Sequence, residues 1–445
     1  MKRVLLLAET AGYQTRSFNK AAAALDVELV FALDRCRGLA DPWGDRSLVV
    51  RYDDDPRSLE AILSAARERP IDGVIALGDQ PTVLAARTAA ALGLPFHPLE
   101  AARASRNKLD TREHFAAAGL PVPSFFCVDA GADPHDVARR VSYPCVVKPL
   151  ALSGSRGVMR ADDGDGFVRA FLRLRHILDA PDLRRMKDPA HAGILVEGFI
   201  AGTEYAVEGL MHGGELHVLA MCDKPDPLDG PFFEETIYVT PSRASAIDQQ
   251  RITAAIATAA AALGLTHGPV HAECRVNGDG VYVLEVAARP IGGLCARALR
   301  FVQARGRAQG SRGASEPPRV GQDPDLVSLE ALLLRHAIGE DVRGLTRETR
   351  ASGVMMIPIP RAGVFRGADG VDAARAVDGI RDVLITAKPD QHLVPLPEGA
   401  SYLGFLFASA ATSPGVVASL HLAHRALHFR IDRELQVAGA GGPQP

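Results

Sequence analysis

Apolar and polar positions alternate in a regular order through the first hundred residues. Short continuous apolar runs, typical of buried strands, are separated by segments in which apolar residues recur every three or four positions, as in amphipathic helices. This order predicts a parallel α/β unit with right-handed crossovers. The predicted strands are 4–8, 27–33 and 73–77, and the predicted helices are 17–25, 57–68 and 81–92.

Two residues follow the third of these strands directly. Gly78 and Asp79 would lie outside its carboxyl end, where open α/β sheets bind ligands. A plain turn after the strand is an equal alternative.

The pattern changes after the first hundred residues. Strand-like segments end at 150 and 200, EYAVEGLM and LHVLAMC suggest antiparallel strands, and an alanine-rich helix is predicted at 247–263. Residues 303–324 are rich in Gly, Arg, Ser and Pro and indicate a linker or surface insertion. The fold class is therefore α/β plus α+β. Beyond the linker we expect a helix near 325–338, strands around 353–359, 381–387 and 403–408, and a closing helix with Ser413 as N-cap and Pro414 as first residue.

Composition narrows the class of protein. A chain of 445 residues is too long for one ordinary core, and 50 basic against 53 acidic residues give a net charge of −3, which argues against nucleic acid as a partner. The start, MKRVLLLAETAG, is interpreted as a strand and not as a signal peptide, and no stretch is long enough to span a membrane. Six scattered cysteines without a CxxC pair indicate reduced core residues. We expect a cytoplasmic protein.

A predicted hairpin carries two glutamates. VHAECRV and VYVLEVAA flank NGDG, and a three-residue loop would set Glu273 opposite Glu285, with their Cβ atoms roughly 5 Å apart. A two- or four-residue loop would put the glutamates on opposite faces. Two carboxylates this close indicate a cation such as Mg²⁺ between them; the alternative is one buried glutamate paired with Arg275 or Arg289.

Two further features point to phosphate chemistry. Alternation along the second strand puts Glu285 and Arg289 on one face, and a guanidinium there can bind a carboxylate or a phosphoryl group. Lys148 ends a predicted strand and is followed by LSGSRGV, whose backbone N–H groups could surround a triphosphate. This loop is not a Walker A motif, because no GK[ST] closes it, and an ordinary turn remains an alternative.

Five segments taken in order resemble the ATP-grasp superfamily: RNKLDTREHFAAAGLPVPSF, YPCVVKPLALSGSRGV, ILVEGFIAGTEYAVEGLM, GPVHAECRV and VYVLEVAARPIGG. The resemblance implies ATP held between two α+β subdomains. It also divides the chain into an N-terminal α/β domain at 1–104, a small subdomain at 105–186, a large subdomain at 187–302, the linker at 303–324 and a C-terminal domain at 325–445.

The resemblance also implies roles for individual residues. Lys108 and Lys148 would contact the phosphates of ATP. The loop that covers these phosphates would consist of Ser153, Gly154, Ser155 and Gly157. The backbone of Glu197 and Ile200 would read the adenine edge, Glu204 would bind ribose, Glu273 and Glu285 would bind magnesium, and Arg289 would face the acyl phosphate.

One departure points to a branch of the superfamily. Ala287 stands where many members have an asparagine ligand, and this is similar to the L-amino acid ligases, the dipeptide synthetase branch of bacilysin-synthetase type. GPFFEETIYVTPS resembles their FEET segment, which makes Glu234 and Glu235 candidates for the substrate amino group. Further substrate candidates are Lys224, which could equally be a solvated loop lysine, His271, which could be a core histidine, and Gly292 and Gly293, which would leave room for a bulky substrate.

The expected function is an ATP-dependent carboxylate–amine ligase that joins an amino acid or similar acid to an amine through an acyl phosphate. Expected cofactors are ATP and Mg²⁺, with Mn²⁺ as an alternative, and expected partners are small-molecule amino acid substrates, with a homodimer left open. Two alternatives are a biotin-carboxylase-like enzyme that uses bicarbonate and a nucleotide-binding regulator without turnover.

Overall fold

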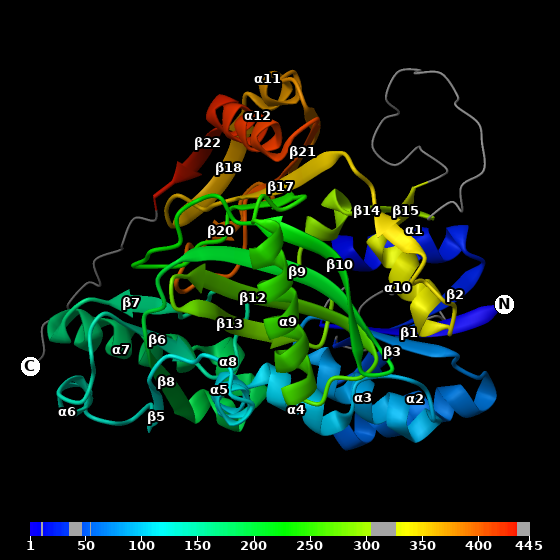
Figure 1. Ribbon diagram of the computed structural model, residues 1–445, viewed down its shortest axis with the longest axis horizontal. Coiled ribbons are helices and arrows are strands. Elements are labelled where there is room, and N and C mark those ends of the chain that lie inside the picture. Colours follow the sequence, from blue (N-terminus) through cyan, green and yellow to red (C-terminus); the bar gives the residue numbers. More distant parts are fainter. Residues whose placement is uncertain (10–11, 35–46, 54, 304–325, 434–445) are drawn as a thin grey trace, which may run out of the picture.

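The computed structural model describes residues 1–9, 12–34, 47–53, 55–303 and 326–433 (Figure 1). The predicted linker lies outside the described residues, except for its first residue. Over the described residues, no helix has the length and apolar character needed to cross a bilayer.

The N-terminal unit is a four-stranded parallel sheet in the order β3-β2-β1-β4, which confirms the α/β prediction. Its third strand in the sequence, β3, is an edge strand of only four residues that the apolar pattern did not indicate. The strands are β1 (Lys2–Ala8), β2 (Val27–Asp34), β3 (Ser47–Val50) and β4 (Gly73–Leu77), and the helices are α1 (Tyr13–Ala24), α2 (Asp55–Glu68) and α3 (Pro81–Leu92).

A small antiparallel sheet follows, in the order β5-β8-β6-β7, with α7 packed on it. Its strand β8 lies beyond residue 186, so the small unit extends past the boundary predicted there, because β8 pairs with both β5 and β6. The elements are α4 (Leu99–Arg106), α5 (Lys108–Ala117), β5 (Phe125–Asp129), α6 (Pro134–Ala138), β6 (Cys145–Pro149), β7 (Met159–Ala161), α7 (Gly164–Leu178), α8 (Pro181–Met186) and β8 (Gly193–Gly198).

The large sheet has eight strands in the order β13-β12-β9-β10-β11-β17-β21-β19. Its last three strands come from the predicted C-terminal domain and join through antiparallel pairing of β17 with β11. The C-terminal region therefore adds three strands to the same sheet (Figure 1). The strands are β9 (Thr203–His212), β10 (Glu215–Asp223), β11 (Ile237–Thr240), β12 (Gly268–Asn277), β13 (Gly280–Ala287), β17 (Ala351–Ile357), β19 (Ile380–Ile385) and β21 (Gly404–Ala410).

Helices and two small sheets complete the fold. The closing helix has Thr412 as its N-cap, one residue earlier than predicted, because its side chain accepts the N–H of Gly415 at 3.3 Å. The predicted helix at 325–338 starts later, after its N-cap Ser328. The elements are α9 (Ala246–Ala262), β14 (Arg300–Gln303), β15 (Val327–Ser328), α10 (Leu329–Ala337), β16 (Leu345–Arg347), β18 (Gly363–Asp369), α11 (Val371–Arg375), β20 (His392–Leu393), α12 (Ser413–Ala426) and β22 (His428–Asp432).

The hairpin formed by β12 and β13 pairs Glu273 with Glu285, as predicted, but by a different route. Its turn contains two residues and not three, because Asn277 pairs with Gly280. A two-residue turn alone would put the glutamates on opposite faces, but a β-bulge after Glu273 shifts the register by one residue and restores the pair.

The described cysteines are free thiols, in agreement with the prediction. Cys145, Cys222, Cys274 and Cys295 are buried and Cys127 is half-buried. Cys36 lies outside the described residues.

The N-terminal sheet and the eight-stranded sheet share one apolar core, and α10 lies between them. Leu332 of α10 packs in the same apolar cluster as Leu6 of β1 and Phe405 of β21. At the start of β4, a Cβ atom on Gly73 would lie 2.4 Å from the backbone oxygen of Ala337, the last residue of α10. Glycine at this position therefore allows β4 and α10 to approach each other closely.

We predict that Gly73→Ala lowers the free energy of unfolding by about 1–3 kcal/mol, because backbone must move to admit the methyl group. Chemical denaturation would measure the change. Gly164→Ala is the matched control, since its nearest neighbour would be 3.8 Å away, and an equal loss in both variants would contradict the packing argument.

Candidate active site

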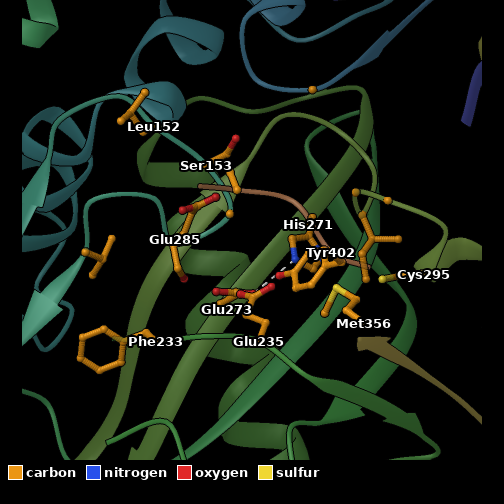
Figure 2. A pocket seen from close by; sticks show the side chains of 18 of the residues that line it. Leu152, Ser153, Phe233, Glu235, His271, Glu273, Glu285, Cys295, Met356 and Tyr402 are labelled. Carbon is orange, nitrogen blue, oxygen red and sulfur yellow. Dashed lines mark ion pairs between the residues drawn. The ribbon is translucent and has the colours of Figure 1, made fainter. Parts of the chain in front are cut away.

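A cavity of about 640 Å³ is lined by residues of the N-terminal sheet, the small sheet and the large sheet. Most residues predicted for the site line it: Lys108, Lys148, Ser153, Gly154, Ser155, Glu197, Ile200, Glu204, Glu235, His271, Glu273, Glu285, Arg289, Gly292 and Gly293. Gly157, Lys224 and Glu234 are not among its lining residues. Figure 2 shows Glu235 and Glu273 side by side beneath His271, with Glu285 nearer to Ser153.

The two lysines enter the cavity from different elements. Lys108 begins α5, and its Nζ donates to the carbonyl of Leu152 at 2.7 Å and lies 3.9 Å from Glu285. Lys148 lies near the end of β6, is buried, and forms an ion pair with Glu197. Burial lowers the pKa of Lys148 to about 8, despite the opposing effect of Glu197.

Glu197 is the centre of a buried ion-pair network. Although burial opposes ionisation, Arg112 and Lys148 lower the pKa of Glu197 to about 2. Arg112 of α5 donates through Nε to Glu197 at 2.9 Å and through its terminal nitrogen to the carbonyls of Val283 and Leu284 at 3.2 and 3.0 Å. The side chain of Glu197 is therefore structural, and its backbone is paired with Phe125 and Val146 inside the small sheet.

The loop after β6 turns tightly, with three residues in the left-handed backbone region. Gly154, Ser155 and Gly157 have φ of 62°, 55° and 75°, in the left-handed region. The N–H of Gly157 donates to the carbonyl of Pro397 at 2.9 Å, and Arg156 donates to the carbonyl of Glu398 at 2.9 Å. The C-terminal region thus supports this loop from behind, and Gly157 serves packing and not the cavity wall.

Lys224 directly follows β10 and is buried among three carboxylates. Its Nζ donates to Glu204 at 2.6 Å, Glu273 at 2.8 Å and Glu235 at 2.9 Å. The interpretation of Lys224 as a solvated loop lysine is wrong, because hydrogen bonds to three carboxyl groups hold it in the interior. These contacts raise the pKa of Lys224 well above its usual value, against the effect of burial.

The carboxyl groups around Lys224 differ in their pKa values. Burial and repulsion from Glu273 raise the pKa of Glu235 to about 7. Lys224 and His271 outweigh burial and hold the pKa of Glu273 well below its usual value. The Tyr238 hydroxyl lies 2.9 Å from both glutamates. Glu273 therefore carries the negative charge of this pair.

His271 lies between two glutamates on the same face of the large sheet. Its Nδ1 is 3.1 Å from Glu208, and its Nε2 is 3.6 Å from Glu273. Hydrogen bonds to Glu208 and Glu273 outweigh burial and raise the pKa of His271 to about 9. The imidazolium is satisfied within the core, and it also forms part of the cavity wall.

Arg289 and Glu285 link the large sheet to the N-terminal unit. Arg289 donates through Nε to Asp79 at 2.5 Å, and its other nitrogen is 3.9 Å from Glu285. Asp79, which follows β4, therefore orients Arg289 instead of forming a plain turn. The alternative in which Arg275 pairs with one of the two hairpin glutamates is wrong, because Arg275 donates to Glu204 at 2.8 Å.

The two ends of the cavity differ in character. At one end Phe199 and Phe233 stack at 6.3 Å, and the Ile200 carbonyl accepts from Arg275 at 2.6 Å. The other end is lined by Tyr402, Met356, Phe405 and Cys295 together with the two glycines. A Cβ atom on Gly292 would meet no atom within 4 Å, as the prediction of open space requires, whereas a Cβ atom on Gly293 would lie 3.3 Å from the ring of Phe405. Glu234 is half-buried outside this lining, so the structure separates it from Glu235.

Models of three protein families match separate parts of the chain. The ATP-grasp N-terminal domain matches residues 19–96, the ATP-grasp domain matches residues 141–298, and the L-amino acid ligase C-terminal domain 2 matches residues 355–432. The chain has the ATP-grasp fold.

Whole-chain comparisons agree with this assignment. The L-amino acid ligase from Bacillus licheniformis superposes with a TM-score of 0.78 and 26% identity over 97% of this chain and 99% of that one. Protein y4rH of Sinorhizobium fredii is 24% identical over 92% of this chain and 79% of its own length. Carnosine synthase 1 of Mus musculus is 28% identical over 54% of this chain, which spans only 30% of that protein.

The carboxylates of this ATP-grasp site fit a hard divalent cation. Glu273 and Glu285 are paired across neighbouring strands and supply oxygen ligands of the kind that Mg²⁺ prefers. Glu285 is free of short ion pairs among the described residues, with its two cationic neighbours each 3.9 Å away. Glu204 and Glu235 also cluster with Glu273, but Lys224 already bonds to all three.

The sequence reasoning missed several residues of this ATP-grasp site. Arg112 could have been found, because it lies one helical turn after Lys108 and so shares its face of α5. Tyr238 and Glu208 gave no such signal, since a tyrosine and a glutamate in apolar strands have many ordinary roles. Asp79 was noticed, but its partner Arg289 lies 210 residues away in the sequence.

We predict that Arg112→Ala lowers the free energy of unfolding by about 3–5 kcal/mol, because it leaves the buried Glu197 with one cation instead of two. Denaturant unfolding would measure the loss. Arg103→Ala, which removes an exposed ion pair to Glu100, is the control and should change stability by less than about 1 kcal/mol. Comparable values for both variants would contradict the role of the network.

We predict that ATP binding weakens as the pH rises through about 8, because Lys148 is protonated below its lowered pKa and neutral above it. The dissociation constant of ATP, measured from about pH 7 to about pH 9, would show this loss. Lys148→Arg keeps its charge over that range, so its affinity should stay level. A variant that loses affinity in parallel with the wild type would show that another group titrates.

Proposed function

We propose that this protein is an ATP-dependent carboxylate–amine ligase that joins an amino acid, or a similar acid, to an amine or a second amino acid. The reaction proceeds through an acyl phosphate and releases ADP and phosphate. The observation that carries the proposal is the meeting, in one cavity, of Lys108 and Lys148, the pair Glu273 and Glu285, and Arg289. The match of the C-terminal region to the L-amino acid ligase domain supports the amino acid substrate class.

The first step transfers the γ-phosphoryl group of ATP to the acid. Lys108 and Lys148 approach the cavity from α5 and β6, where their ammonium groups can neutralise phosphate oxygens. The N–H groups of the loop at Ser153 to Ser155 cover the same position. Glu273 and Glu285 would hold Mg²⁺, which neutralises charge on the phosphates when it is bound.

The second step is attack of the amine on the acyl phosphate. Arg289, oriented by Asp79, supplies a fixed guanidinium that can bind the acyl phosphate through paired hydrogen bonds. Glu235 lines the cavity, and its raised pKa allows it to meet the incoming ammonium group as a carboxylate or to remain neutral near pH 7. The protein needs no nucleophile of its own, because positioning and charge neutralisation carry both steps.

The end of the cavity opposite Phe199 would determine which substrate binds. Tyr402, Met356 and Phe405 give this end an apolar wall, and Gly292 leaves space beside it. We therefore expect an amino acid with an apolar or aromatic side chain as one substrate. The free, buried cysteines agree with a cytoplasmic setting for the reaction.

The proposal predicts ADP and a new amide when the purified protein is incubated with ATP, Mg²⁺ and pools of amino acids. Coupled ADP detection and mass spectrometry of products would measure both. Arg289→Ala should lower kcat/KM by about 100-fold or more, because it removes charge stabilisation from the transition state. Arg103→Ala on the surface of α4 should leave the rate unchanged.

Two outcomes would favour the alternatives. ADP formation that requires bicarbonate, with biotin as acceptor, would indicate a carboxylase. ATP binding without turnover in any pool would indicate a nucleotide-binding regulator.

A further inference from the structure

Five histidines gather away from the ATP cavity, at the other end of β9 and β12. His212 ends β9, His217 lies on β10, His267 immediately precedes β12, and His336 lies on α10. His97 joins them from the loop before α4, where it lies beside Gly268. None of these residues lines the ATP cavity.

The pairing of the strands explains why two of them meet. β9 and β12 are antiparallel, and Gly268 is the partner of Met211. One step further along the same register places His267 opposite His212. Both positions share a sheet face with His271 and Glu208, because side chains alternate along a strand. Four residues separate His267 from His271, so the histidine group lies roughly 13 Å along the strand from the active site.

Three of the rings present their nitrogens to one another. The ligand atoms of His212, His267 and His336 all lie within 4.8 Å, and the Nδ1 of His212 is 3.2 Å from the Nε2 of His336. The rings of His267 and His336 are stacked, with centroids 4.2 Å apart. Two imidazole nitrogens on one tetrahedral zinc ion, with bonds of about 2.0–2.1 Å, would lie about 3.3 Å apart. The closest pair already has this separation.

An imidazole binds a metal through a ring nitrogen that carries no proton, and an ordinary histidine is mostly neutral above about pH 7. A neutral ring keeps one lone pair for a metal. In the hydrogen bond between His212 and His336, one of the two facing nitrogens carries a proton. If that ring changes its tautomer, the proton moves to the other nitrogen of the same ring, and both facing nitrogens are then free to bind a metal.

The surroundings also leave polar atoms without partners. The buried Nδ1 of His97 and Nε2 of His217 have no hydrogen-bond partner among the described residues, which is costly in a protein interior. His212 and His267 are only half-buried and adjoin the exposed turn at 213–215, which gives an ion a path from solvent. Stacking of the rings alone does not explain why these two nitrogens are buried without partners.

We propose that His212, His267 and His336 form a binding site for a divalent transition-metal ion of the zinc type. Imidazole ligands favour Zn²⁺, Co²⁺, Ni²⁺ and Cu²⁺ over Mg²⁺, so this site differs in metal class from the oxygen ligands of the ATP cavity. The ion would join β9 and β12 of the large sheet to α10, which packs against the N-terminal unit. Its role is therefore to fasten the two units together outside the reaction site.

Zinc retention after dialysis would test the site directly. The protein is loaded with Zn²⁺ in the presence of excess Mg²⁺, which blocks oxygen sites, then freed of unbound zinc and analysed for metal content and thermal unfolding. We expect one Zn²⁺ per chain and a melting temperature that rises on loading. Co²⁺ in place of Zn²⁺ should give the visible absorption of a low-symmetry, nitrogen-bound ion.

Variants assign the ligands. His212→Asn and His267→Gln change half-buried side chains, and each should weaken Zn²⁺ binding about tenfold or more while the melting temperature in chelator stays near that of the wild type. The double variant His135→Ala/His428→Ala removes two exposed histidines elsewhere and should bind Zn²⁺ normally. Wild type without retained Zn²⁺, or equal retention in all variants, would overturn the proposal.

Discussion

The ammonium group of Lys224 is the charge on which the site depends. Glu204 and Glu273 belong to neighbouring strands, and Glu235 comes from the segment before β11. Three buried carboxylates would repel one another strongly in the interior, and an uncompensated charge there is far more costly than one at the surface. By bonding to all three, Lys224 fixes where the acidic wall of the cavity lies before any ligand arrives.

Much of the fold could be predicted because the relevant patterns are local. Continuous apolar runs revealed the parallel unit, and alternation revealed the hairpin of Glu273 and Glu285. The bulge that makes this pair possible has no local signature, so the correct pair was reached from an incorrect turn length. The partners of Lys224 and Arg289 could not be predicted from composition, because they depend on contacts between residues up to 210 positions apart.

The histidine group illustrates the same limit. His212, His267 and His336 are separated by 55 and 69 residues, whereas the histidines at 421, 424 and 428 attract notice through their spacing. In the structure His421 binds Asp226 at 3.2 Å and His428 begins β22. Spacing along a chain identifies ligands only within one helix or one loop. A register shared by two strands brings ligands together without leaving a motif.

The junction between β11 and β17 sets where this protein can be divided. A cut after residue 350 would leave β11 as an exposed edge with unpaired N–H and C=O groups, and such edges pair readily with other chains. The same cut would remove Pro397 and Glu398 from behind the loop that follows β6. A chimera that exchanges substrate-binding parts between relatives should therefore keep the eight-stranded sheet from one parent and place its crossover in a connecting loop, not at the sequence boundary between domains.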